Sequence, residues 1–195
     1  MKKAILLVLV MLFCVGTVTG CSGGETEHSF VMLSLEQGDI VIELYPETAP
    51  QTVKHFLDCV KSGYYDGKVF HRTIPGLIQG GSKDGFGVGG NGKTVFGEFS
   101  ANGFENNLKH ERGVVSMARG EDFNSASAQF FIMTGVQSYL DGQYATFGRV
   151  VEGIEIADEI AQMPTRGWSN DELVQKPVIK KAVVLKNYTP PAAKK

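Results

Sequence analysis

The sequence has little cysteine and little histidine, with 3 and 4 residues respectively in a chain of 195. So few cysteines exclude a small fold that is held together by several disulfides. The four histidines show no spacing that is typical of metal ligands, so we expect no metal site. They are His28, His55, His71 and His110.

The sequence also lacks an excess of charge of either sign. Lys and Arg total 19 against 21 Asp and Glu, which gives a formal net charge of −2. Without a basic surface field, we do not expect the protein to bind nucleic acid. Apolar residues make up 43% and charged residues 21%, as in ordinary globular proteins, and 195 residues suffice for one domain with its own core.

The sequence has only one long apolar run, and this run lies close to the N-terminus. Lys2 and Lys3 precede the apolar residues 4–15, which are too few for a membrane-spanning helix. A short positive start followed by such a run is typical of an export signal, which we assign to residues 1–20. An exported protein meets little ATP, which argues against a nucleotide-binding function.

The predicted signal ends in a motif, VTGC, that resembles the lipobox of bacterial lipoproteins. In such proteins the cysteine becomes the mature N-terminus and carries lipid, so we expect Cys21 to be lipidated. The protein would then be exported and anchored to the outer face of the cell membrane or to a periplasm-facing membrane. Residues 21–29 would form a flexible tether. The alternative is an ordinary signal peptide that is cleaved nearby.

Of the three cysteines, Cys59 would remain without a disulfide partner, because Cys14 leaves with the signal and Cys21 carries lipid. Its neighbours Phe56 and Val60 are apolar, which favours a packed thiol over a nucleophile.

Alternating apolar residues predict several strands with glycine-rich turns between them. Residues 30–36 and 40–44 alternate on either side of a Gln-Gly-Asp turn and predict a β-hairpin. Further strand-like runs cover residues 68–74, 114–117, 129–133, 146–151 and 178–185.

Two segments have the periodicity of amphipathic helices. In the first, Thr48 can cap the N-terminus, Pro50 suits the first turn and Gly63 closes the helix. The second spans about residues 154–162. Because the helices do not alternate with the strands, a closed antiparallel barrel covered by helices fits better than a parallel sheet. We place the domain at residues 30–188 and a disordered tail at residues 189–195.

Two glycine-rich motifs overlap in residues 85–94. GVGGNGKT matches the phosphate-loop pattern G-x-x-x-x-G-K-[ST], and GFGVGG matches the dinucleotide pattern G-x-G-x-x-G. Both need a helix that begins at the motif, so that backbone N–H groups face the anion. Lys93 and Thr94 are followed by Val-Phe-Gly, which is a poor helix start. We therefore predict a surface loop that binds no nucleotide.

Three separated motifs resemble those of the cyclophilins. They are FHRTIPG at residues 70–76 with QGG at 79–81, SMAR at 116–119 with SAQFFI at 127–132, and YLDGQY at 139–144 with FG at 147–148. Their order and spacing match across about residues 30–185. The resemblance implies a mainly β fold, a closed eight-stranded antiparallel barrel capped by two helices. It also implies cis–trans isomerisation of X–Pro bonds without a cofactor.

The resemblance further implies which residues form the site. Arg72, Gln129 and Phe131 would be the catalytic set, with Arg72 as a hydrogen-bond donor to the twisting prolyl unit. Phe131, Met117, Leu140 and Leu77 would line the proline pocket. The other expected substrate contacts are Ile78, Gln79, Ala118, Arg119, Tyr139 and Tyr144, with the backbone of residues 118 and 119 aligning the peptide.

One residue is missing between Pro-Gly and Gln79, relative to the family pattern. A slip of one residue turns side chains to the other face, so a bulge or a shortened turn must absorb it. Either Leu77 or Ile78 could therefore face the pocket. Simple alternation would place Arg72 on the same face as Phe70 and Ile74.

Two functions remain open at this point. The first is a surface-anchored prolyl isomerase that assists the folding of exported proteins. The second is a binding module or chaperone that holds proline-containing segments without turnover. The Arg72, Gln129 and Phe131 set favours the first, and the missing residue before Gln79 is the argument for the second. In either case we expect a monomer whose partners are proline-containing peptides or unfolded segments, and a membrane through Cys21.

Overall fold

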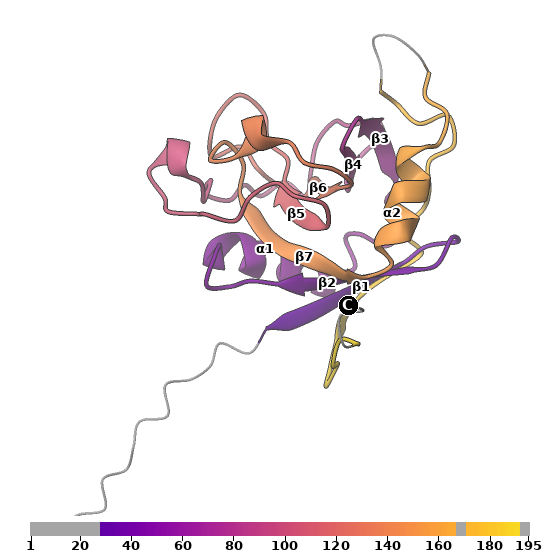
Figure 1. Ribbon diagram of the computed structural model, residues 1–195, viewed down its shortest axis with the longest axis horizontal. Coiled ribbons are helices and arrows are strands. Elements are labelled where there is room, and N and C mark those ends of the chain that lie inside the picture. The colour runs from indigo at the N-terminus through magenta and orange to yellow at the C-terminus, as the bar shows by residue number, and fades with distance from the viewer. Residues whose placement is uncertain (1–27, 167–170, 192–195) are drawn as a thin grey trace, which may run out of the picture.

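The computed structural model describes residues 28–166 and 171–191 (Figure 1). The predicted signal and Cys21 lie outside these residues. The strands are β1 (Ser29–Ser34), β2 (Asp39–Leu44), β3 (Phe70–Ile74), β4 (Leu77–Gly80), β5 (Val114–Met117), β6 (Phe130–Met133), β7 (Thr146–Glu152) and β8 (Lys181–Leu185). The helices are α1 (Pro50–Lys61) and α2 (Ile154–Ala161), with 3-10 turns η1 (Ser100–Asn102) and η2 (Ser138–Leu140). Within the described ranges, no helix has the length and apolar character needed to cross a membrane.

The strands form one antiparallel sheet in the order β3-β4-β6-β5-β7-β2-β1-β8, which curls into a half-barrel. The prediction of a closed barrel is wrong, because β3 and β8 do not pair with each other. Val69 and Val178 form an isolated bridge near the seam, and β8 begins only at Lys181. Pro177 has no N–H group and so cannot extend this pairing as a regular ladder.

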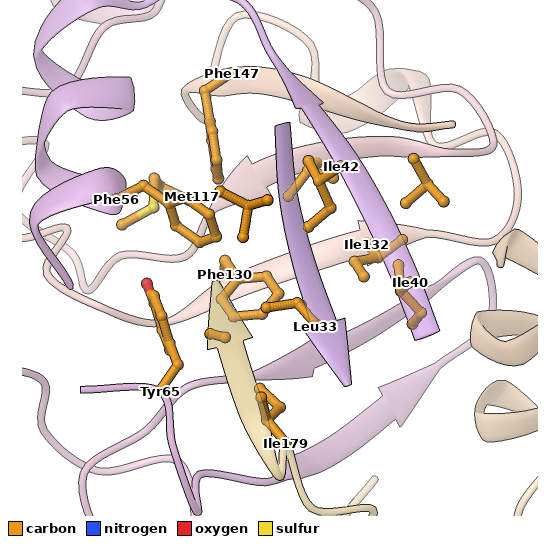
Figure 2. Close-up of a cluster of buried hydrophobic side chains, with 14 of the residues drawn as sticks. Leu33, Ile40, Ile42, Phe56, Tyr65, Met117, Phe130, Ile132, Phe147 and Ile179 are labelled. Atoms are coloured by element: carbon orange, nitrogen blue, oxygen red, sulfur yellow. The ribbon is translucent and has the colours of Figure 1, made fainter. Parts of the chain in front are cut away.

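The core lies on the inner face of the curled sheet, where α1 covers it (Figure 2). Phe56 of α1 points into this core, with ring centroids 5.0 Å from Phe147 and 5.5 Å from Phe130. Cys59 lies on the buried side of α1, and burial raises the pKa of its thiol, as the prediction of a packed thiol requires. The helix α2 buries the stripe of apolar residues that its periodicity predicts, namely Ile156, Ala157 and Ile160.

The N-terminus of α1 is capped from a distant part of the chain. The prediction that Thr48 caps it is wrong, because the N-cap is Ala49, which makes no side-chain cap bond. The buried carboxylate of Glu98 instead accepts hydrogen bonds from the backbone N–H groups of Gln51 (3.0 Å) and Thr52 (2.8 Å). These two groups would otherwise lack partners, and a negative charge at a helix N-terminus is stabilising.

Candidate active site

The outer face of the sheet carries a second apolar cluster, separate from the core, which we call the outer cluster. Its buried members are Leu77, Val114, Phe131, Met133 and Leu140. Ile74, Leu108, Ala118 and Tyr144 pack around it and are partly buried. Along β6, Phe131 therefore faces the outer cluster while Phe130 and Ile132 face the core, as strand alternation predicts.

The same alternation determines which of Leu77 and Ile78 faces the outer cluster. Leu77 belongs to the outer cluster, whereas Ile78 is fully buried in the core. Met117 lies opposite Phe130 in the β5–β6 register and also packs in the core. The placement of Met117 in the proline pocket is therefore wrong, because paired residues of neighbouring strands point to the same face of a sheet.

A tight turn accommodates the missing residue before Gln79, and a bulge lies further along the same hairpin. Ile74 pairs with Leu77, so only Pro75 and Gly76 form the turn, where Gly76 has a φ of 91° that favours glycine. The register of β3 against β4 then shifts between Phe70 and Arg72, which leaves His71 as the extra residue.

This bulge turns Arg72 away from the core. Phe70 is fully buried in the core, whereas Arg72 pairs with Gln79 on the outer face and is about half exposed. The expectation that Phe70 and Arg72 share a face is wrong for this reason. Between them His71 is buried, and burial lowers its pKa to about 4, with smaller effects from the Lys176 and Arg72 charges.

A row of polar side chains runs from Arg72 along the edge of the outer cluster. Arg72 Nη1 donates to Gln79 Oε1 (3.3 Å), and Gln79 Nε2 donates to Gln129 Oε1 (3.0 Å). Gln129 Nε2 donates in turn to the carbonyl oxygens of Gly87 (2.9 Å) and Gly89 (3.0 Å). The two glutamines therefore hold both the guanidinium and the glycine-rich loop in place.

The glycine-rich loop lacks the structure of a phosphate loop. No helix begins at Lys93 or Thr94 in the described chain, and Val95 instead forms an isolated bridge with Ala126. The prediction of a surface loop at residues 85–94 is confirmed. The loop borders a polar recess that is lined by Gln79, Gly87, Gly89, Gly90, Ala118, Arg119, Gly120, Ser125, Ser127 and Gln129.

The remaining candidate residues lie around this recess and the outer cluster. Leu140 is buried in the cluster, while its neighbour Tyr139 on η2 is exposed. Tyr144 meets Phe131 edge to face at 5.7 Å between ring centroids. Arg119 is held over the Tyr144 ring at 4.8 Å and donates from Nε to the Gln143 carbonyl (3.0 Å).

The backbone N–H of Ala118 donates to the Gln129 carbonyl oxygen at 2.9 Å. A substrate peptide aligned by Ala118 would therefore bind the carbonyl oxygen of Ala118, because the N–H group of Ala118 already has a partner.

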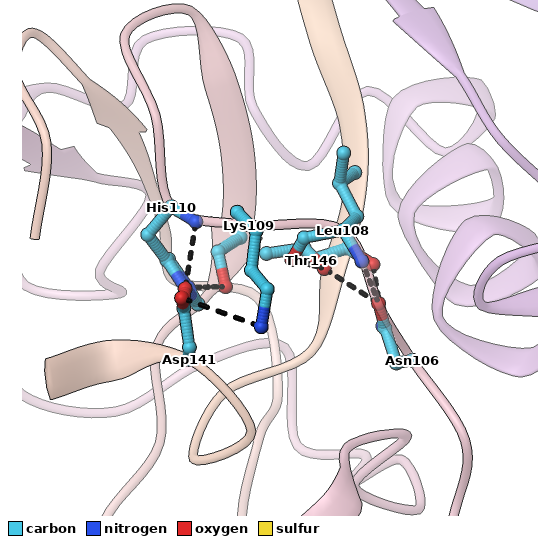
Figure 3. A network of polar contacts seen from close by, with 7 residues as sticks. Asn106, Leu108, Lys109, His110, Asp141 and Thr146 are labelled. Atoms are coloured by element: carbon cyan, nitrogen blue, oxygen red, sulfur yellow. Dashed lines mark hydrogen bonds and ion pairs between the residues drawn. The ribbon is translucent and has the colours of Figure 1, made fainter. Parts of the chain in front are cut away.

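His110 supports Phe131 from behind, a role that no motif or spacing in the sequence indicates. Its ring stacks on Phe131 at 5.8 Å between centroids, with 17° between the ring planes. Asp141 Oδ1 lies 3.0 Å from Nδ1, and the Ser116 hydroxyl lies 3.1 Å from Nε2 (Figure 3). Burial lowers the pKa of His110, while the Asp141 carboxylate opposes this change. Because a carboxylate oxygen accepts, Nδ1 carries a proton in this contact.

The Ser116, His110 and Asp141 contacts have the order of a hydrolase triad, but Ser116 is fully buried. A substrate cannot reach its hydroxyl, so the network orients side chains and does not supply a nucleophile.

Comparison with known proteins gives consistent matches over this domain. Residues 30–184 match the family model described as "Cyclophilin type peptidyl-prolyl cis-trans isomerase/CLD". The chain is 39% identical over 171 residues to peptidyl-prolyl cis-trans isomerase A of Dickeya dadantii, a match that covers 85% of this chain and 87% of that protein. It is 40% identical over 157 residues to peptidyl-prolyl cis-trans isomerase ppi1 of Schizosaccharomyces pombe, covering 80% and 98%.

Among solved structures, a cyclophilin type peptidyl-prolyl cis-trans isomerase of Cryptosporidium parvum superposes with a TM-score of 0.74 at 30% identity. The match covers 83% of this chain and 100% of that one. The same Cryptosporidium protein in the presence of the dipeptide Ala-Pro superposes with a TM-score of 0.72.

Proposed function

The chain belongs to the cyclophilin-type peptidyl-prolyl cis-trans isomerases, and on this premise we propose that it accelerates X–Pro isomerisation in exported proteins with Arg72 as donor. The proline ring packs on the outer cluster beside Phe131, Leu77 and Leu140. Gln79 and Gln129 hydrogen-bond the peptide. The observation that carries the proposal is the position of Arg72, a half-exposed guanidinium held by Gln79 at the edge of this apolar cluster.

The chemistry needs only binding and electrostatics. An X–Pro bond loses its resonance as it twists, which makes the uncatalysed step take tens to hundreds of seconds. The twisted state has a pyramidal prolyl nitrogen with a free lone pair, so a donor placed near this nitrogen stabilises it more than either planar isomer. No covalent bond breaks, and the reaction therefore requires neither a nucleophile nor a metal.

The decisive test is an isomerisation assay on the fragment from Ser22 onward. We expect this fragment to accelerate the cis–trans exchange of a proline-containing tetrapeptide, measured by exchange NMR. Saturable binding of the peptide without faster exchange would contradict the proposal and favour the alternative, a binding module or chaperone for proline-containing segments.

We also propose that Cys21 carries lipid and holds the mature protein at a membrane, with residues 21–29 as the tether. The VTGC motif after an apolar run supports this. A single acyl chain binds membranes only marginally, so stable anchoring requires at least two. Mass spectrometry of the mature protein should find an N-terminal Cys21 that carries a diacylglyceryl group. An unmodified N-terminus elsewhere in the chain would contradict this proposal, and Cys21→Ala, which should release the protein from membranes, is the matched control.

A further inference from the structure

A short segment after α2 adds to the free edge of β3 beside Arg72. Arg72 and Glu172 form an antiparallel bridge. The Thr73 N–H donates to the Asp171 carbonyl (2.8 Å), and the Leu173 N–H donates to the His71 carbonyl (2.9 Å). Leu173 is fully buried in the core and anchors the segment. The backbone of Asp171 is thus fixed next to Arg72.

From this position the Asp171 carboxylate reaches the guanidinium. Arg72 Nη2 lies 3.2 Å from Asp171 Oδ2, while Nη1 is bound to Gln79. The two terminal nitrogens of Arg72 are therefore held by acceptors from separate parts of the chain.

The neighbouring carboxylate of Glu172 serves other partners, because it lies 2.7 Å from Lys176 Nζ and 3.6 Å from Arg166 Nε. Of the two adjacent acids, Asp171 is the one that pairs with the proposed catalytic arginine.

We propose that Asp171 is a positioning residue that holds the Arg72 guanidinium ready for the twisting prolyl bond. The inference rests on the function proposed for Arg72. A free arginine side chain has much rotamer freedom, which must be lost before it can donate in one direction. A second anchor removes part of that freedom before the substrate arrives, which is how a prepared donor accelerates a reaction.

A carboxylate could also act in the opposite sense, by neutralising the charge that the substrate needs. Both side chains are partly exposed, at 44% for Arg72 and 47% for Asp171, so water weakens this neutralisation. A guanidinium has five N–H donors, and the two contacts leave others free. Positioning is therefore the larger effect. Its size is limited, because pairs of this kind contribute little more than about 1 kcal/mol.

The test begins with Asp171→Asn in the full-length protein. We expect kcat/KM on a proline tetrapeptide to fall by about two- to fivefold, with the loss in kcat and little change in KM. The loss should shrink in about 1 M salt, where the Debye length is about 3 Å. Asp171→Glu should keep part of the activity. The matched control is Asp158→Asn on α2, which removes an ion pair with Arg112 and should leave kcat/KM and its salt dependence unchanged.

The same substitution in an Arg72→Ala background completes the test. If Asp171 acts through Arg72, Asp171→Asn should have no further effect there. An equal loss in both backgrounds, or faster turnover in the single variant, would overturn the inference. If Arg72→Ala slows the reaction and Asp171→Asn does not, this inference alone fails. If Arg72→Ala has no effect, the mechanism proposed for Arg72 fails with it.

Discussion

Replacing Arg72 by alanine should lower kcat/KM by roughly ten- to a hundredfold. A hydrogen bond from a charged donor contributes about 1.5–3 kcal/mol, and about 1.4 kcal/mol corresponds to a tenfold change in rate. This free energy accelerates the reaction only to the extent that the bond is stronger in the twisted state than in either planar isomer. The fall should therefore be in kcat more than in KM. The measurement is kcat/KM on a proline tetrapeptide for each variant.

Arg72→Lys is the informative companion to this variant. An ammonium keeps the charge but lacks the planar fork with which Arg72 donates to Gln79 and Asp171 at the same time. Lysine should therefore restore little activity. Both variants should keep a thermal midpoint close to that of the wild type, because Arg72 lies on the outer face and not in the core. Activity near that of the wild type in Arg72→Ala would contradict the mechanism. Loss of activity with a collapsed midpoint would instead assign Arg72 a structural role.

The sequence predicts local features of this molecule well. The apolar alternation around Phe131 and the stripe of Ile156 and Ile160 each determine which face is buried, because the faces of strands and helices follow from a fixed period. These predictions of buried faces depend on residues that are close together in the chain. The common surface of Arg72, Gln129 and Phe131 is different, because only the resemblance to the cyclophilins implied it.

The predictions fail where a feature depends on distant contacts or a break in periodicity. The bulge at His71 adds one residue, and this alone moves Arg72 from the face of Phe70 to the outer face. Glu98 caps α1 across 46 positions, and Asp171 lies 99 positions from Arg72. A propensity or a motif contains no information about such pairs. Likewise, alternation within the last strand cannot reveal that β8 begins too late to pair with β3.

Phe130 and Phe131 are consecutive on β6 but face opposite sides, and the same substitution at each should give opposite results. Phe130 is fully buried, with ring centroids 5.4 Å from Tyr65 and 5.8 Å from Phe70. Phe130→Ala should cost about 3–5 kcal/mol of stability, since the core cannot collapse around the cavity. In a domain of this size the thermal midpoint should fall by roughly 6–20 °C. Well below that midpoint, kcat/KM per folded molecule should remain close to that of the wild type.

Phe131→Ala should instead mainly affect the reaction. The ring supplies apolar surface to the outer cluster next to Leu77 and Leu140, where the proline ring is proposed to pack. Losing the burial of one such group is worth about 1.5–3 kcal/mol, so kcat/KM should fall by roughly ten- to a hundredfold. Its midpoint should fall less than that of Phe130→Ala, because water can enter beside the rim residues Ala118 and Tyr144. Thermal unfolding and peptide kinetics of both variants test the pair. If both variants lost the same amount of activity, the proposal would be contradicted that the core face of β6 serves stability and its outer face serves the reaction.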